Sequence, residues 1–176
     1  MLEPAPTTPI DPELARGTLE SVIEATALQP AHVVLTFPNT NYRLYLLPNP
    51  ASALEQLRAR VGKRAIGTIR CEAKRVDRTT TGGRYVEPVY GRPRRVQGTI
   101  VAVNPQANTI TVHAGMPVVA KVTAPGQKAS DFEVGEFVGF AAAPGATFSP
   151  QAVGAGSGGS AAKNATQQEP AGTPGA

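Results

Sequence analysis

Cysteine is nearly absent from this sequence, since Cys71 is the single cysteine among 176 residues. One thiol cannot form an internal disulfide or a cysteine-based metal cage. Long apolar runs are also missing, because none approaches the roughly 18 residues that a membrane span requires. The first residues, MLEPAPTTPIDPE, lack the basic and apolar regions of a secretory signal. We therefore expect a cytoplasmic protein with no membrane partner.

Motifs of catalysis are missing as well. The sequence contains no GxSxG, Walker loop, GxGxxG or HExxH. His32 and His113 have no ligand partner at metal-binding spacing, so we expect structural or solvated histidines. Cys71 is expected to be a small buried hydrophobe, with a reactive thiol beside Arg70 as the alternative. The sequence therefore predicts no enzyme, no cofactor, no metal site and no small-molecule substrate.

Aromatic residues make up only 5% of the chain, whereas it has 18 glycines and 17 prolines. This composition favours a turn-rich, mainly β protein. Residues 32–37 and 42–47 form a predicted hairpin, and residues 64–77 form a long strand. The run 84–90 is predicted to return after the turn 79–83, with Pro88 confining it to an edge or a bulge. That turn, between Arg78 and Arg84, is expected to be a hairpin turn, with a phosphate-binding loop as the alternative.

Two segments carry helix signals. Asn49 as the cap, Pro50, Leu57 and Gly62 as the C-terminal glycine predict one short helix. Residues 13–26 could also begin a helix at Asp11, but a glycine inside that run costs a helix about 1 kcal/mol relative to alanine. The similarity of residues 16–22 to residues 97–103 favours a strand from Gly17 to about Glu24, with the helix as the alternative.

The sequence also contains an internal repeat. Residues 16–22 (RGTLESV) resemble residues 97–103 (QGTIVAV), the hairpin recurs at 109–113 and 118–122, and residues 60–64 (RVGKR) resemble 133–137 (EVGEF). Three blocks in the same order indicate duplicated units. We predict a flexible segment 1–12, a first unit 13–95 with a basic hairpin extension, a second unit 96–150 and a disordered tail 151–176.

The order of elements in each unit resembles an OB-fold or a related small Greek-key barrel. The residues Gly98-Thr-Ile100, Asn108-Thr-Ile-Thr-Val112 and Asp131-Phe-Glu-Val-Gly135 also make the second half resemble a short bacterial β-barrel domain of unknown function. These resemblances imply two tandem OB-like barrels of five strands, with one short helix in the first. They imply a fold rather than an activity.

Positive charge is concentrated in residues 58–95, which hold twelve of the seventeen Lys and Arg and have a net charge of +9. The whole chain is +4, so the remainder is −5. A block of one sign attracts polyanions, and nearby tyrosines offer surfaces for stacking bases. We therefore predict a non-catalytic module that binds single-stranded or structured RNA or DNA with low sequence specificity, through a basic, tyrosine-containing face of the first barrel. The alternative is a protein-interaction or assembly module whose basic face docks an acidic partner. The predicted binding residues are Arg43, Tyr45, Lys63, Arg64, Arg70, Lys74, Arg75, Arg78, Arg84, Tyr85, Tyr90, Arg92, Arg94 and Arg95.

Overall fold

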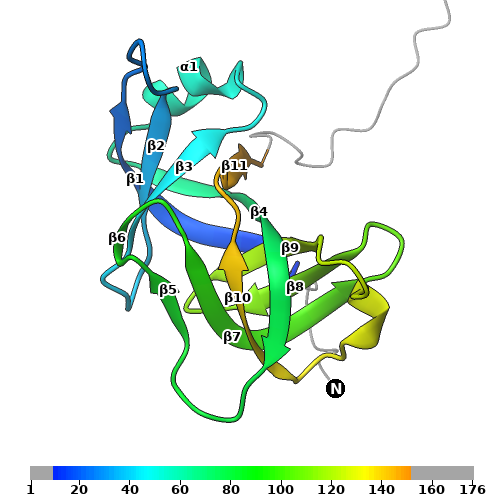
Figure 1. The fold of residues 1–176 in the computed structure, drawn as a ribbon. Coiled ribbons are helices and arrows are strands. Elements are labelled where there is room, and N and C mark those ends of the chain that lie inside the picture. The colour runs from blue at the N-terminus through cyan, green and yellow to red at the C-terminus, as the bar shows by residue number, and fades with distance from the viewer. Residues whose placement is uncertain (1–9, 152–176) are drawn as a thin grey trace, which may run out of the picture.

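A computed structural model describes residues 10–151, and the described chain is mainly β, as predicted (Figure 1). One α-helix, α1 (Ala53–Arg58), and one 3₁₀ helix, η1 (Ala129–Asp131), accompany the strands of this part. The strands are β1 (Leu14–Ile23), β2 (His32–Thr36), β3 (Arg43–Pro48), β4 (Arg64–Arg78), β5 (Tyr85–Glu87), β6 (Tyr90–Gly91), β7 (Arg95–Asn104), β8 (Thr109–His113), β9 (Pro117–Val122), β10 (Phe137–Ala142) and β11 (Thr147–Pro150). The predicted disordered tail and most of the predicted flexible first segment lie outside the described residues. Within residues 10–151, no helix has the length and apolar character needed to cross a membrane.

A closed circuit of paired strands forms the upper part of the molecule in Figure 1, and we call it the first circuit. It runs β1–β2–β3–β11–β4 and returns to β1. All these pairs are antiparallel except β3 with β11, where Leu47 lies opposite Thr147 in a parallel register. The strand that closes this circuit therefore comes from the end of the described chain.

A second circuit lies below it and runs β7–β8–β9–β4–β10 and back to β7. Its one parallel pair is β9 with β4, in which Cys71 lies opposite Ala120. The 15-residue β4 thus belongs to both circuits: its first half pairs with β1 and β11, and its second half with β9 and β10. Each circuit is completed by a strand from the other half of the sequence. The predicted division at residues 95 and 96 stays a prediction.

The repeated sequence blocks make the same contacts in both circuits. β1 has a register irregularity between Leu19 and Ser21, and β7 has one between Ile100 and Ala102. At the first irregularity Gly62 N donates to Leu19 O at 2.7 Å, and at the second Gly135 N donates to Ile100 O at 2.9 Å. Both glycines have a positive φ, which glycine adopts at no steric cost. In each repeat, the glycine of the Val-Gly pair therefore forms a backbone hydrogen bond to β1 or β7 at its bulge.

Alternation along β1 settles the open alternative for residues 13–26 in favour of a strand. Ala15, Gly17 and Leu19 are buried, while the residues between them are exposed. A side chain at position 17 would place its Cβ 2.5 Å from the carbonyl oxygen of Thr36, so the neighbouring strand requires glycine. The glycine that weakens a helix here is thus a packing requirement of the sheet.

The predicted helix exists, but its predicted start and end are wrong. α1 begins at Ala53 after Ser52, and Asn49 does not cap it. Asn49 instead bonds to β11, because its backbone N–H donates to Phe148 O and its side chain donates to Ser149 Oγ. Gly62 follows a further turn and bonds to β1 rather than ending the helix.

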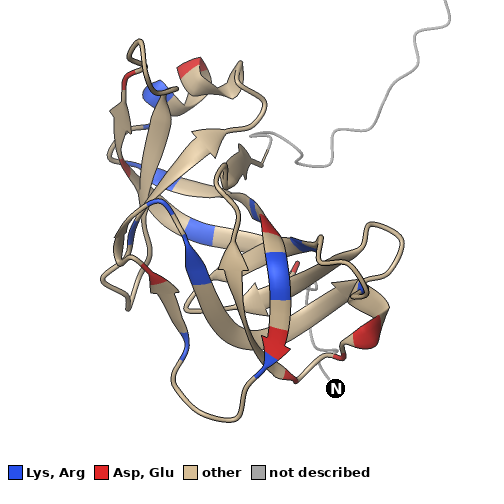
Figure 2. Cartoon of the chain, viewed as in Figure 1, with Lys and Arg blue, Asp and Glu red and all other residues tan. Residues whose placement is uncertain are grey.

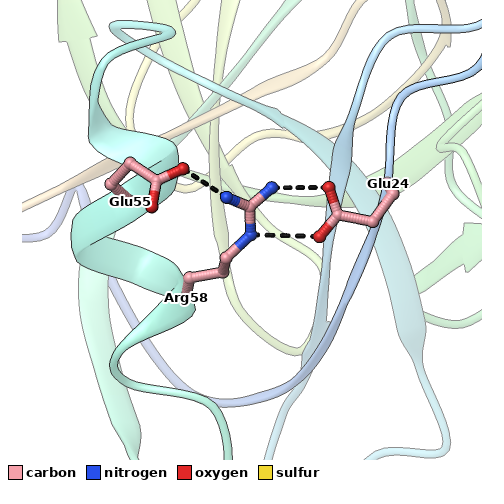
Figure 3. A network of polar contacts seen from close by, with 3 residues as sticks. All are labelled: Glu24, Glu55 and Arg58. Atoms are coloured by element: carbon pink, nitrogen blue, oxygen red, sulfur yellow. Dashed lines mark hydrogen bonds and ion pairs between the residues drawn. The ribbon is translucent and has the colours of Figure 1, made fainter.

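An exposed ion-pair network connects α1 to the end of β1 (Figure 3). Arg58 Nε donates to Glu24 Oε1 at 3.0 Å, and the same guanidinium also contacts Glu55. Ion pairs at the surface contribute little to stability because water screens them. The network orients α1, whereas burial of Leu57 anchors it in the core.

The predicted return of residues 84–90 alongside the preceding strand is wrong. A cis bond between Glu87 and Pro88 divides the run into β5, which pairs with β7, and β6, which pairs with β3. β10 already occupies the edge of β4 where a hairpin partner would lie. Residues 79–95 therefore bridge the two circuits and do not form a basic hairpin extension.

Candidate functional site

A cationic groove follows β10, with β4 on one side and β7 on the other. Its volume is about 630 Å³. Figure 2 shows Lys and Arg on β4 and β7 on either side of an uncharged β10. The cations that line it are Lys74, Arg75, Arg78, Arg94 and Arg95.

The groove exists because the middle strand presents small residues. Gly139 lies between Asp77 and Gln97, and Ala141 lies opposite Arg95. Alternation points Val138 and Phe140 into the core, and the outward positions along the groove, Gly139 and Ala141, carry almost no side chain. Longer side chains on the two neighbouring strands then form walls above a low floor.

The cations of the groove differ in how they are already neutralised. Arg75 pairs with Asp77 at 2.9 Å, and Arg78 pairs with Glu136 at 2.7 Å. The Arg78 guanidinium also lies over the Phe132 ring at 4.9 Å. The hydrogen bond from Arg78 lowers the pKa of Glu136, so this pair stays charged at neutral pH.

The other three groove cations, Lys74, Arg94 and Arg95, have no ion pair within residues 10–151. They face the same groove from opposite strands, Lys74 from β4 and Arg95 from β7. Cations that share a concave surface without a counter-ion raise the local concentration of anions. Within the groove, this trio is the positive charge that is available to a ligand.

Gln97 holds the loop 79–83 at the edge of the groove. Its Nε2 donates to Thr81 O at 3.2 Å and to Gly83 O at 3.0 Å. Gly82 has a positive φ and lies against this side chain. The loop carbonyls are therefore used internally. Neither the importance of Gln97 nor that of Gly139 has any signal in the sequence.

A tyrosine face lies next to the groove, and we define it as Arg43, Tyr45 and Tyr90. The two rings pack edge to face with centroids 5.4 Å apart, and the Arg43 guanidinium lies 5.6 Å from the Tyr90 ring centre. A hydrogen bond with Tyr90 raises the pKa of Tyr45, so its hydroxyl stays protonated. Tyr90 remains 58% exposed.

The segment 91–95 connects the tyrosine face to the groove. Arg92 and Tyr45 line one small slot, while Arg94 and Arg95 line the groove. Nine of the fourteen predicted residues thus lie along one route over the surface: Arg43, Tyr45, Lys74, Arg75, Arg78, Tyr90, Arg92, Arg94 and Arg95.

The structure places the remaining predicted residues elsewhere. Lys63 and Arg64 lie where the chain leaves the α1 end of the first circuit, and Arg70 contacts Glu13 at 3.9 Å beside a separate cleft. Arg84 lies near His113, and Tyr85 is the first residue of β5. Proximity in sequence therefore overstated the extent of one continuous surface.

The potential catalytic groups have properties that suit structural roles. Cys71 is buried, and burial raises the pKa of its thiol to about 12, so it is a neutral thiol at physiological pH. Residues 10–151 contain no group of three His, Cys, Asp or Glu that could hold a metal ion.

Comparison with known proteins gives no match to a family model, a curated protein or a solved structure.

Acid is expected to destabilise the protein through its two histidines. Burial lowers the pKa of His32 and His113, and the charges of Arg92 and Arg84 lower them further. The unfolded chain then binds these protons more readily, so the stabilisation is complete above the ordinary value of 6.5 and is lost as pH falls below it. Thermal melts between about pH 7.5 and pH 5 should show a falling Tm, and the double variant H32Q/H113Q should show a flatter dependence. An unchanged slope in the double variant would contradict this assignment.

Proposed function

We propose that the cationic groove and the tyrosine face form one non-catalytic surface that binds single-stranded or structured nucleic acid with little sequence preference. The observation that carries this proposal is the trio Lys74, Arg94 and Arg95, which faces one groove from two strands without a counter-ion in the described chain. Phosphate contacts of this kind supply most of the affinity in sequence-independent binding.

The shape of the groove supports a polymer rather than a single small anion. Its volume is about 630 Å³ and its floor is Gly139 and Ala141, so a backbone can approach the sheet closely. The cations lie along the strands on both sides of the groove, so successive phosphates of a bound strand can each contact a different cation. A chain of phosphates fits a surface of this length and charge.

The tyrosine face favours a ligand whose unpaired bases lie next to the phosphates in the groove. Base stacking on an aromatic ring contributes about 1–3 kcal/mol per base and tolerates any sequence. Tyr90 is more than half exposed, and Tyr45 and Arg43 fix its position from β3. Bases of a paired duplex are stacked on one another and cannot use this face.

We also propose that each circuit is an OB-like small barrel. Both have five strands. In chain order α1 lies between the third and fourth strands of the first circuit, and η1 lies between the fourth and fifth strands, β9 and β10, of the second. OB-folds bind oligonucleotides on the face of their second and third strands. In the first circuit this face carries Arg43 and Tyr45, whereas β8 and β9 of the second are buried almost throughout. The second barrel contributes instead through the groove on its strands β4, β10 and β7.

Removing the free cations is expected to abolish most of the binding. We expect K74Q/R94Q/R95Q to reduce the slope of log affinity against log salt by about 3, because each lost phosphate contact reduces it by about 1. Fluorescence anisotropy with labelled single-stranded RNA and DNA at about 50 and 200 mM salt measures this slope.

A matched control is R16Q/K63Q/K121Q, which changes the net charge equally through three exposed cations outside the groove. It should retain most of the affinity and slope. Equal loss in both triple variants would show a diffuse charge effect and overturn the assignment of the groove. If the wild-type chain does not bind nucleic acid at low salt, the proposed function is refuted, and an acidic protein becomes the expected ligand of the same cations.

A further inference from the structure

A small slot lies on the outer side of β2 and β3, beside the tyrosine face. Its volume is about 70 Å³, and His32, Tyr45, Arg92 and Pro93 are among the residues that line it. Pro30, Leu47 and Ala146 supply apolar walls. The slot is thus separate from the groove and contains one cation and one imidazole.

Arg92 is held beside the slot with donors to spare. Its Nη2 donates to Gln29 Oε1 at 3.0 Å, which fixes the guanidinium through a neutral partner. Arginine has five N–H donors, and no acid within residues 10–151 pairs with this one. The charge is therefore positioned but not neutralised by the described chain.

His32 adds a buried polar group on the other side. The residue is 4% exposed, although it begins β2 at the sheet surface. Burial and then the Arg92 charge lower the pKa of its imidazole, while a hydrogen bond to the Pro30 carbonyl acts in the opposite direction. An anion in the slot would cancel the effect of Arg92 and allow the ring to take up a proton.

The size of the slot distinguishes between ligands. One water needs about 10–15 Å³ of such volume, so 70 Å³ holds a few waters. A tetrahedral oxyanion fits this space, whereas the planar ring of a nucleobase with its sugar does not. Arginine is also well matched to phosphate oxygens because two of its N–H groups can donate in parallel.

We infer that the slot between His32 and Arg92 binds a phosphate monoester group. Its position beside Tyr45 makes the terminal phosphate of a nucleic-acid strand the expected source, and this part rests on the proposed function. A strand with its last bases on the tyrosine face would present its end group to Arg92. A free phosphate or a small phosphorylated molecule offers the same chemistry.

The first test uses inorganic phosphate and the full chain. His32 and His113 are the only histidines, so two imidazole signals report the titration by NMR. At constant ionic strength, about 10 mM phosphate should raise the pKa of His32 saturably and leave His113 unchanged, since charge-assisted contacts give millimolar affinity or better. R92Q should remove the response. R84Q is the matched control, because Arg84 acts on His113 as Arg92 acts on His32.

The second test separates the two sources of phosphate. Oligonucleotides with a 5′- or 3′-terminal phosphate are compared with the same sequences ending in hydroxyls. One phosphorylated end should bind about tenfold more tightly, and R92Q should abolish the difference. No His32 response to phosphate, or a response that survives R92Q, overturns the inference even if oligonucleotides bind. A His32 response without any oligonucleotide binding refutes the proposed function and assigns the slot to a small phosphorylated molecule.

Discussion

A chain that ends at Ala146 is expected to lose its cooperative fold. This truncation removes β11, which closes the first circuit between β3 and β4. It also removes Phe148, whose side chain is 1% exposed. Loss of a buried phenylalanine side chain alone costs about 3–5 kcal/mol, a large share of the roughly 5–15 kcal/mol that stabilises a domain. Measured by circular dichroism, neither a thermal melt nor a urea titration at 25 °C should show a two-state transition.

A chain that ends at Gln151 is the control for this truncation. It keeps all four residues of β11 and the hydrogen bond from Gln151 N to Ile66 O. We expect its melting curve to match that of the full chain. A folded, cooperative protein ending at Ala146 would show that β11 is dispensable and that the first circuit is complete without it.

Gly98→Ala is expected to destabilise the second circuit by about 3 kcal/mol or more, because overpacking against backbone cannot be relieved by a rotamer change. A Cβ at this position would lie 2.2 Å from the carbonyl oxygen of His113. Strands β7 and β8 would have to separate, in the region where β7 also pairs with β10. Urea unfolding of the purified variant measures the loss as a lower midpoint.

Gly83→Ala supplies the comparison for this glycine. Nothing lies within 4 Å of a Cβ built there, so we expect a change within about 0.5 kcal/mol. Gly17→Ala should behave like Gly98→Ala, since its Cβ would meet Thr36 O at 2.5 Å at the matching position of the repeat. A mild effect at both 17 and 98 would contradict the close approach of these strands.

Local patterns in the sequence predicted the elements of this fold well. Both strands of the hairpin 32–47 were predicted to within one residue at each end, and the long strand that ends at Arg78 was predicted over nearly its full length. The repeated Gly-Thr and Val-Gly blocks were recognised as matching units, and they make matching hydrogen bonds. These features depend on neighbours in sequence or on side-chain direction, which residue order specifies directly.

Long-range pairing was not predictable in the same way. The parallel pairs β3–β11 and β4–β9 join residues up to about a hundred positions apart, and no pattern within either strand indicates its partner. The groove depends on two further long-range pairings, in which β10 inserts between β4 and β7. Basic residues were identified from charge alone. Arg75 is neutralised by Asp77, two positions along the same strand, but the acid that neutralises Arg78 is Glu136, 58 positions away in the sequence. Gln97 and Gly139 gain their roles through register.

The sharing of β4 reverses the order in which the two circuits can close during synthesis. Chains emerge from the ribosome N-terminus first, and early segments usually fold first. The first circuit, however, needs β11, the last strand of the described chain, so it stays open until that strand emerges. The second circuit borrows β4, which is already made, and is complete once β10 emerges. The half that is synthesised later is therefore the first to have all five of its strands available for pairing.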